Sequence, residues 1–344
     1  MTALAGLSLS ELEKLISPLP RFRAGQIYKW IINGVTGFEQ MTNIPVVLQK
    51  TLTERFYLFS SSVAGCHEDK AARKFILSLE DSEIIEAVLL NDNKNRFTAC
   101  LSTQAGCPIG CLFCKTGSLG FKRNLKSYEI IEQLLHIKSI TNLKIKNPQI
   151  DNIVIMGMGE PLLNIENLRK AIDVFTDSSG MNISKRRITV STCGICNGLF
   201  DIAKNGPYIR LALSLVTADE SLRQKLIPAA RNNPLNEIRE ALLLFQNNGG
   251  GRITLEIPLL GGINTRENDA KSIAGFAKGI GAVINIIPWN PVPGLEFEGK
   301  PLREPSKTER EEFISMLEKH KLKVTMRLHK GQRIMGACGQ LGNL

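Results

Sequence analysis

Six short apolar segments follow one another from residue 97 onward, and helical stretches separate most of them. The segments are residues 97–103, 152–158, 187–192, 209–216, 252–260 and 282–289, and the clearest helices are expected at 127–140, 165–176, 235–247 and 267–279. Strands that alternate with helices form parallel sheets through right-handed crossovers. The pattern therefore predicts an α/β fold, a barrel of six strand–helix units, open or closed, with the helices outside. A last strand is expected at 323–328.

The residues before this pattern are organised differently. Residues 1–62 show helical spacing and open with the capping pattern S-L-S-E. Two strand-like runs at 73–80 and 83–90 are joined at Asp81-Ser82, which predicts a β-hairpin. We therefore expect a helical accessory domain at 1–62, a hairpin extension at 63–96, the α/β core at 97–330 and a tail at 331–344.

Three cysteines directly follow the first core strand. Cys107, Cys111 and Cys114 stand in the run C-P-I-G-C-L-F-C. Thiolates hold iron–sulfur clusters, and a cubane held by three of them leaves a fourth iron open to chelate S-adenosylmethionine. Phe113 would help to keep that site dry. Zinc or three core thiols are the alternatives, and zinc would need a fourth ligand, for which His136 is the nearest downstream candidate.

Glycine and small polar residues follow the later strands. Gly159 and Glu160 lie in the turn G-M-G-E after the second strand, and Ser191, Ser214 and Asn290 end later ones. Barrels of this kind place their chemistry at the C-terminal ends of the strands. Glycines let the backbone approach a ligand closely, and Glu160 could receive a ligand ammonium group. Each residue alone is an ordinary turn residue, but together with the cysteines they predict one shared site.

The charge balance points to the kind of partner. The chain has 43 Lys and Arg against 33 Asp and Glu, a formal net charge of +10. This excess favours RNA held through its phosphates over a merely soluble basic surface. The N-terminal helices, Lys122 and Arg123 are the expected phosphate contacts. Trp289 could stack on a base, but packing is the favoured interpretation.

Cellular location can be predicted only in outline. No apolar run reaches membrane-spanning length, and residues 1–15 lack the basic start of a secretory signal. Eight cysteines in a chain of 344 residues fit a reducing cytosol better than a disulfide scaffold. We therefore expect a cytoplasmic protein that has no membrane partner.

Several motifs, spread over nearly the whole chain, belong to one pattern. They are the cysteine triplet, G-M-G-E-P-L-L-N (157–164), I-I-P-W-N-P-V-P-G (286–294), A-C-G-Q-L (337–341) and the N-terminal F-R-A-G-Q-I-Y-K-W-I and F-E-Q-M-T-N-I-P. The pattern resembles the RlmN/Cfr family of radical S-adenosylmethionine methyltransferases, which act on adenosine in RNA. The resemblance implies a partial (β/α)6 barrel, a [4Fe-4S] cluster and two S-adenosylmethionine molecules per turnover. It also implies 23S rRNA and tRNA as substrates, flavodoxin or ferredoxin as electron donor, and a monomer.

The resemblance gives three residues catalytic roles. Cys338 would take a methyl group from one S-adenosylmethionine, and a 5′-deoxyadenosyl radical from a second would remove hydrogen from it. The methylene radical would then add to adenine C2, or to C8 as in the Cfr relatives. Cys100 would resolve the adduct through a transient disulfide with Cys338. Glu86 aligns with the proton acceptor across a one-residue gap, so a solvated strand carboxylate is its alternative.

The resemblance also supplies cofactor contacts and exposes departures from the family. Its contacts around S-adenosylmethionine are Gly159, Glu160, Ser191, Ser214, Leu215, Val216 and Asn290. Val216 stands where the family has histidine or asparagine. The run S-T-C-G-I-C-N adds Cys193 and Cys196, which could be core thiols or a second metal or redox pair. Another radical reaction and an RNA-binding iron–sulfur sensor are the competing functions.

Overall fold

The centre of the protein is one mixed sheet, seen in a computed structural model that describes residues 2–92, 96–144, 150–326 and 330–342. The ten strands follow the order β16-β13-β12-β11-β10-β9-β6-β5-β4-β3. The run from β6 to β16 is parallel. Its strands are β6 (Phe97–Leu101), β9 (Ile150–Ile155), β10 (Ile188–Thr192), β11 (Arg210–Ser214), β12 (Ile253–Leu259), β13 (Ala282–Pro288) and β16 (Val324–Met326).

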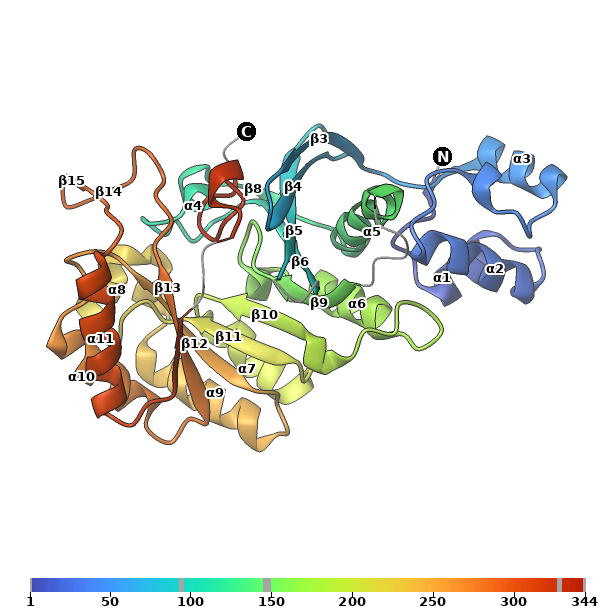
Figure 1. Cartoon of the computed structure of the whole chain (residues 1–344). Helices are drawn as coiled ribbons and strands as arrows, with labels where there is room; N and C mark the ends of the chain where they lie inside the picture. The colour runs from blue at the N-terminus through green and yellow to red at the C-terminus, as the bar shows by residue number, and fades with distance from the viewer. Residues whose placement is uncertain (1, 93–95, 145–149, 327–329, 343–344) are drawn as a thin grey trace.

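Helices cover the outside of this parallel part, which makes it a partial α/β barrel (Figure 1). The main ones are α5 (Ser127–Lys144), α6 (Ile165–Thr176), α7 (Cys196–Asn205), α9 (Leu235–Asn247), α10 (Glu267–Ala277) and α11 (Lys307–Lys319). The predicted strands and the four predicted helices are confirmed. Residues 327 and 328 of the predicted last strand lie outside the described residues.

An antiparallel extension continues the sheet beyond β6. The predicted hairpin is confirmed as β4 (Ala72–Ser78) and β5 (Ile84–Asn91), with β5 paired to β6. Sequence analysis did not predict β3 (Ser62–Glu68), whose residues are mostly exposed and mixed in polarity. A small hairpin of β7 (Gln104–Gly106) and β8 (Phe121–Asn124) flanks the cysteine loop together with α4 (Lys115–Ser118).

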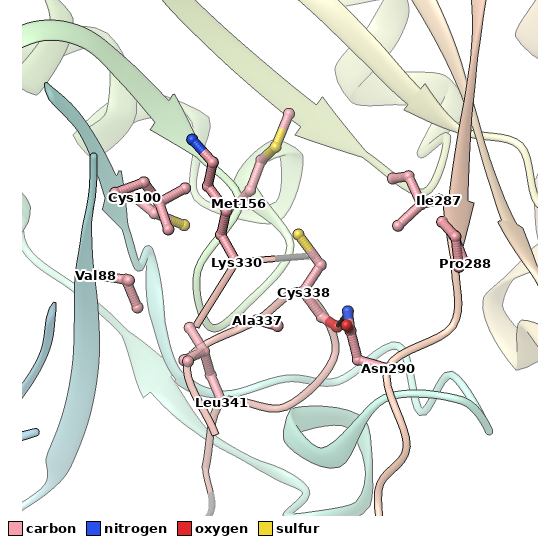
Figure 2. A pocket seen from close by; sticks show the side chains of 12 residues that line it. Val88, Cys100, Met156, Ile287, Pro288, Asn290, Lys330, Ala337, Cys338 and Leu341 are labelled. Atoms are coloured by element: carbon pink, nitrogen blue, oxygen red, sulfur yellow. Dashed lines mark hydrogen bonds between the residues drawn. The ribbon is translucent and has the colours of Figure 1, made fainter. Parts of the chain in front are cut away.

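The end of the chain folds back onto the middle of the sheet. The described part of the C-terminal segment, residues 330–342, includes the short helix η5 (Gln332–Ile334). Side chains of this segment line a cavity together with side chains of β5, β6 and the end of β13 (Figure 2). The tail therefore reaches strands that precede it by more than two hundred residues in the sequence.

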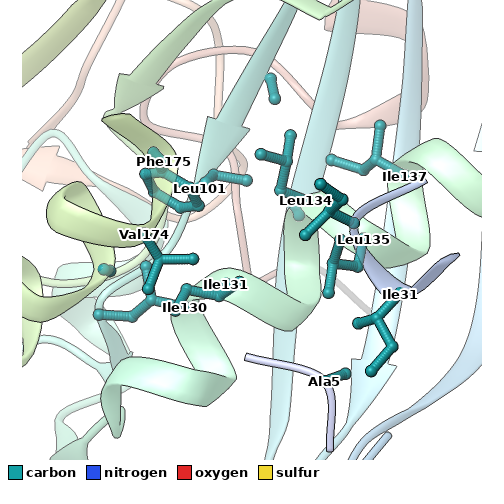
Figure 3. Close-up of a cluster of buried hydrophobic side chains, with 14 of the residues drawn as sticks. Ala5, Ile31, Leu101, Ile130, Ile131, Leu134, Leu135, Ile137, Val174 and Phe175 are labelled. Carbon is teal, nitrogen blue, oxygen red and sulfur yellow. The ribbon is translucent and has the colours of Figure 1, made fainter. Parts of the chain in front are cut away.

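The N-terminal helices share a hydrophobic core with the first half of the sheet. They are α1 (Leu9–Leu15), α2 (Arg21–Ile32) and α3 (Val46–Arg55), and a capping box of Ser8 and Glu11 opens α1. Ile31 and Ala5 pack near Leu135 and Ile137 of α5 (Figure 3). A second core lies between β10–β13 and helices α7, α9, α10 and α11. Burial of apolar side chains thus fixes the helices to the barrel.

Two shorter helices and two small pairs of strands add to these elements. They are α8 (Glu220–Leu226), η4 (Pro228–Asn232), the pair β1 (Thr2–Ala3) and β2 (Phe56–Tyr57), and the hairpin of β14 (Glu296–Phe297) and β15 (Lys300–Pro301). Within the described ranges, no helix is both long and apolar enough to span a bilayer.

Candidate active site

The three cysteines of the triplet line one cavity at the C-terminal ends of the parallel strands, which we call the cluster cavity. Backbone contacts hold their loop in place. The Cys107 N–H donates to the Gly120 carbonyl at 2.9 Å, and the Leu112 N–H donates to the Leu226 carbonyl at 3.0 Å. At Gly106, with φ +73, a Cβ would lie 1.9 Å from the Gly120 oxygen. Glycine is therefore required just before Cys107.

The chemistry of these thiols fits a metal cluster. Burial raises the pKa of Cys107 to about 12 and raises the pKa values of Cys111 and Cys114. A nearby metal reverses this, because a coordinating thiol loses its proton. The thiolates of a cluster each bind a different iron, so three cysteines are enough to hold it, whereas a structural zinc takes four ligands.

His136, the candidate for a fourth zinc ligand, lies away from the three cysteines. The His136 Nε2 atom lies 3.0 Å from the Ser61 Oγ atom, and the ring stacks on Phe59 with centroids 4.2 Å apart. His136 is buried, and it does not belong to the residues that line the cluster cavity. The residues present therefore fit a three-cysteine cluster better than zinc.

The cluster cavity has about 980 Å³ of empty volume, part of it open to solvent. Gly157, Gly159, Glu160, Ser191, Ser214 and Asn290 line it together with the cysteines. The Oγ atoms of Ser191 and Ser214 lie 3.3 Å apart at the ends of β10 and β11. The polar residues predicted to share one site are thus brought together from the ends of four strands, β9, β10, β11 and β13.

Glu160 is held in place by the backbone around it. One of its carboxylate oxygens accepts the Leu162 N–H at 3.0 Å, and the other accepts the Cys193 N–H at 2.8 Å. Burial raises the pKa of Glu160, while these donors act in the opposite direction. Gly159 has φ +102, and a Cβ there would meet Gln104 at 2.5 Å. The turn therefore fixes a buried carboxylate at the cavity wall.

Two residues assigned to the cofactor by resemblance lie elsewhere. Leu215 and Val216 are fully buried and are absent from the described lining of the cluster cavity. The Val216 N–H donates to the Glu256 carbonyl at 3.2 Å, and its own carbonyl accepts the Asn264 side-chain amide at 2.8 Å. Val216 also has φ +65, a strained conformation for a β-branched residue. Its backbone is thus used within the protein.

Glu256 is a cavity residue that sequence analysis missed. It lies in β12 and lines the cluster cavity, although only 6 % of it is exposed. An acidic residue within the otherwise apolar strand I-T-L-E-I-P-L was a usable signal, because a carboxylate in a buried strand needs a partner or a function.

Cys100 and Cys338 line a second cavity, which we call the thiol cavity. Figure 2 shows both sulfur atoms directed into the space between β6 and the C-terminal segment. Met156, Ile287, Pro288, Asn290 and Cys338 line the thiol cavity and the cluster cavity alike. Cys338 therefore stands at the junction of the two cavities, and the chain end and the cysteine triplet meet in one region.

Backbone hydrogen bonds fix the segment around Cys338. The Asn290 side-chain amide donates to the Cys338 carbonyl at 3.0 Å. The Lys115 N–H donates to the Gly339 carbonyl at 2.8 Å. The Thr116 hydroxyl donates to the Leu341 carbonyl at 2.7 Å. Because Lys115 and Thr116 directly follow Cys114, the cysteine loop itself anchors the tail.

Glu86 is buried beneath this segment. None of it is exposed, so the alternative of a solvated strand carboxylate is wrong. Its Oε1 atom lies 2.8 Å from the Lys74 Nζ atom, and its Oε2 atom accepts the Gly342 N–H at 2.7 Å. Among the described lining residues of the two cavities Glu86 does not appear. A neighbouring strand and the tail thus enclose its carboxylate.

The additional C-x-x-C motif is split between two environments. Cys193 lines the cluster cavity, and its carbonyl accepts a hydrogen bond from Arg223. Cys196 begins α7 and packs in the second core. All eight cysteines lie in the described residues, and none forms a disulfide. The structure favours separate buried thiols over a redox pair.

The remaining candidates are also placed. Trp289 is buried, and its Nε1–H donates to the Phe113 carbonyl at 2.8 Å, so the packing interpretation is confirmed. Arg123 of β8 forms ion pairs with Asp81 and Glu129. These ion pairs connect the β7–β8 hairpin to the β4–β5 turn and to α5, so the guanidinium group is engaged within the protein. Lys122 is exposed next to it.

Comparison with known proteins agrees with this site. Residues 101–272 match the Radical SAM superfamily, and residues 2–58 match the ribosomal RNA large subunit methyltransferase N-terminal domain. A Treponema denticola protein called probable dual-specificity RNA methyltransferase RlmN is 45% identical, covering 99% of this chain and 96% of that protein. A Syntrophomonas wolfei protein of the same name is 40% identical, covering 98% and 96%.

A solved structure shares the whole architecture. The crystal structure of a radical SAM methyltransferase from Sphaerobacter thermophilus superimposes with a TM-score of 0.92 at 32% identity, and the match covers 99% of each chain. The superfamily implies a [4Fe-4S] cluster and S-adenosylmethionine, which the cysteine triplet and the cluster cavity fit. The chain belongs to the RlmN family of radical S-adenosylmethionine methyltransferases.

Proposed function

We propose that the protein methylates an adenosine carbon of RNA, C2 in preference to C8, by way of a methylated Cys338. The observation that carries the proposal is the position of Cys338, which lines both the cluster cavity and the thiol cavity that contains Cys100. A residue at this junction can receive a group on one side and deliver it on the other. The relatives named dual-specificity RNA methyltransferase support RNA as the substrate.

Each part of the site has a task in this proposal. Cys107, Cys111 and Cys114 would hold the cluster, and Gly159, Glu160, Ser191, Ser214 and Asn290 would bind S-adenosylmethionine. When bound, these groups supply a methyl cation equivalent and a means of removing hydrogen from an S-methyl group, with two S-adenosylmethionine molecules used per turnover. Cys338 would act as the nucleophile that carries the methyl group. Leu215 and Val216 would only shape the cavity from behind.

Two further residues would complete the transfer. Once the adduct has lost its unpaired electron, which the cluster would accept, and the proton of its adenine carbon, the Cys100 thiolate would attack the Cys338 sulfur. The sulfur–methylene bond would break, the methylene carbon would keep that electron pair and take up a proton to become the methyl group, and a reductant would reopen the Cys100–Cys338 disulfide. Glu86 would accept the proton that leaves the adenine carbon, and the Lys74 Nζ atom, 2.8 Å away, would fix the position of its carboxylate. The apolar residues Val88 and Leu90 of the thiol cavity would exclude water from these steps.

The RNA would present its adenosine unpaired, because pairing hides the base edge. We propose 23S rRNA near the peptidyl transferase centre as the main substrate and tRNA as a second. Exposed lysines such as Lys122 and the basic N-terminal helices would contact phosphates. A flavodoxin or ferredoxin would supply electrons to a cytoplasmic monomer.

Nucleoside mass spectrometry tests this proposal. Deleting the gene should abolish 2-methyladenosine in 23S rRNA, and the wild-type gene should restore it while a Cys338→Ala gene should not. Appearance of 8-methyladenosine instead would reject the preference for C2. Unchanged methylation in the Cys338→Ala strain would reject the methyl-carrier role.

A further inference from the structure

The last described residue of the chain lies against the most enclosed carboxylate of the site. Gly342 gives its N–H to the Oε2 atom of Glu86 at 2.7 Å, while Lys74 occupies the Oε1 side at 2.8 Å. The side chains of Lys74 and Glu86 are only 2% and 1% exposed. A hydrogen bond to an ionised, buried acceptor is stronger than a neutral one and is costly to lose. Glu86 is therefore a firm anchor for the chain end.

This anchor differs in kind from the other contacts of the C-terminal segment. Lys115, Thr116 and Asn290 bind carbonyl oxygens between residues 338 and 341, whereas Glu86 binds the N–H that follows them. Lys115 and Thr116 belong to the cysteine loop, but Glu86 belongs to β5 on the far side of the thiol cavity. Cys338 is thus held between two walls. At the β5 wall, the Lys330 Nζ atom donates to the Asn91 carbonyl at 2.9 Å at the start of the segment, and Glu86 holds the segment beyond Cys338.

The same contact restricts Glu86. Both of its oxygens face a partner, none of the residue is exposed, and it belongs to the lining of neither described cavity. A base in a cavity cannot pass a proton to a carboxylate that the chain end covers, because proton transfer needs direct hydrogen-bond contact or one bridging water. The contact must therefore open before Glu86 can act on a substrate.

We propose that Glu86 is a latch with two alternative partners. With Gly342 bound, Glu86 positions the C-terminal segment and holds Cys338 at the junction of the two cavities. With RNA bound, residues 341–342 lift, and the carboxylate becomes available to the adenine carbon. The second half rests on the proposed function, whereas the positioning of the segment does not.

Two truncations of the C-terminus test whether the contact between Gly342 and Glu86 positions Cys338. Removing residues 342–344 deletes the Gly342 N–H, and removing residues 343–344 keeps it as a matched control. In the cluster-loaded protein without RNA or S-adenosylmethionine, alkylation of Cys338 by iodoacetamide is followed by peptide mass spectrometry. We expect alkylation of Cys338 to be about tenfold faster than in wild type when residues 342–344 are removed. When only residues 343–344 are removed, the rate should stay within about twofold of wild type. Equal rates in both truncations would overturn the positioning role.

A second variant removes the acceptor instead of the donor. Glu86→Leu combined with Lys74→Met replaces the buried pair by apolar side chains of similar size, a change that folded proteins often tolerate. Its folding is checked by thermal unfolding. Faster alkylation of Cys338 in the folded double variant supports the latch, and a wild-type rate contradicts it. The Cys196→Ser protein serves as a control for an unrelated buried change.

The exchange of partners is tested on the complete enzyme with RNA. Hydrogen exchange of the amides at 339–342 is measured with and without an unmodified transcript of the peptidyl transferase region of 23S rRNA. We expect the transcript to increase exchange at Gly342. Protection of Gly342 that persists in a complex active in methylation would overturn the masking of Glu86. If the protein does not methylate RNA at all, the alkylation experiment still decides the positioning role.

Discussion

The ends of parallel strands and the loops after them line the cluster cavity, whereas segments far apart in the sequence line the thiol cavity. The first takes Glu160, Ser191, Ser214 and Glu256 from successive parts of the barrel. The second takes Val88, Cys100, Lys330 and Leu341 from the antiparallel extension, β6 and the tail. The barrel supplies most of the first cavity, which the tail reaches only at Cys338 and Gly339, whereas the second forms only when the chain end returns to the sheet.

The two cavities also differ in the functional groups that they offer. Carboxylates, serine hydroxyls and the cysteine triplet stand among apolar side chains in the cluster cavity, as binding a charged cofactor requires. The thiol cavity offers two thiols, Asn290 and Lys330 among apolar side chains, which suits a flat base. The comparison suggests that cofactor binding and methyl transfer can be disrupted separately, which the following variants test.

Loss of the cluster should disable both cavities. In Cys111→Ser the cluster is lost, so visible absorbance, 5′-deoxyadenosine formation and RNA methylation should all fall at least about a thousandfold. Cys196→Ser is the matched control, because that thiol packs in the second core and should cost only about 1 kcal/mol. A Cys111→Ser protein that retains absorbance and activity would refute the assignment of the triplet.

Loss of Cys338 should disable the thiol cavity alone. Cys338→Ala keeps the triplet and Glu160, so it should still bind S-adenosylmethionine with a Kd within about threefold of wild type and form 5′-deoxyadenosine. RNA methylation should be lost. Anaerobic assays of both products measure the separation, and parallel loss of both would contradict two separable cavities.

Loss of Cys100 should stop the reaction after methyl transfer has begun. Cys100 faces Cys338 across the thiol cavity, so Cys100→Ala should leave RNA joined to the protein through Cys338. Denaturing electrophoresis with labelled RNA should detect this adduct, and the Cys100→Ala/Cys338→Ala double variant should lack it. An adduct that also forms in the double variant would involve another residue.

A change remote from both cavities provides the baseline. Burial lowers the pKa of His136 to about 4, so the unfolded chain binds more protons than the folded one between pH 6.5 and 4. Stability contributed by neutral His136 is therefore present above pH 6.5 and is lost as the pH falls. The free energy of unfolding is measured with urea at pH 7 and at pH 4.5. Between these pH values, the free energy of unfolding of the wild type should fall by about 2–3 kcal/mol more than that of His136→Phe. Equal losses would indicate an ordinary histidine.

Sequence analysis predicted the cluster cavity better than the thiol cavity, and the reason is physical. Parallel strands bring their C-terminal ends to one edge, so a motif such as G-M-G-E is placed once the strand before it is recognised. Contacts between Glu86 and Gly342 join residues 256 positions apart, and no local pattern encodes them. The burial of Glu86 and the anchoring of the tail by Lys115 and Thr116 therefore had to come from the structure.

Local geometry also bears on some assignments. Leu215 and Val216 follow Ser214 at the end of β11, but both are buried and neither belongs to the described lining of the cluster cavity, so their contact with the cofactor stays a prediction from the resemblance. Arg123 has the charge of a phosphate contact, but two nearby carboxylates bind it. Charge and position in a motif predict where a residue lies more reliably than they predict its partner.

The fate of isotopic label on Cys338 tests the central claim most directly. The enzyme is supplied with S-adenosylmethionine that carries a trideuterated methyl group, and the Cys338 peptide and the methylated RNA are analysed by mass spectrometry. The account predicts a trideuterated methyl group on Cys338 and a product methyl group that has exchanged one of its deuterium atoms for hydrogen. An unlabelled Cys338, or a product methyl group that keeps all three deuterium atoms, would contradict it.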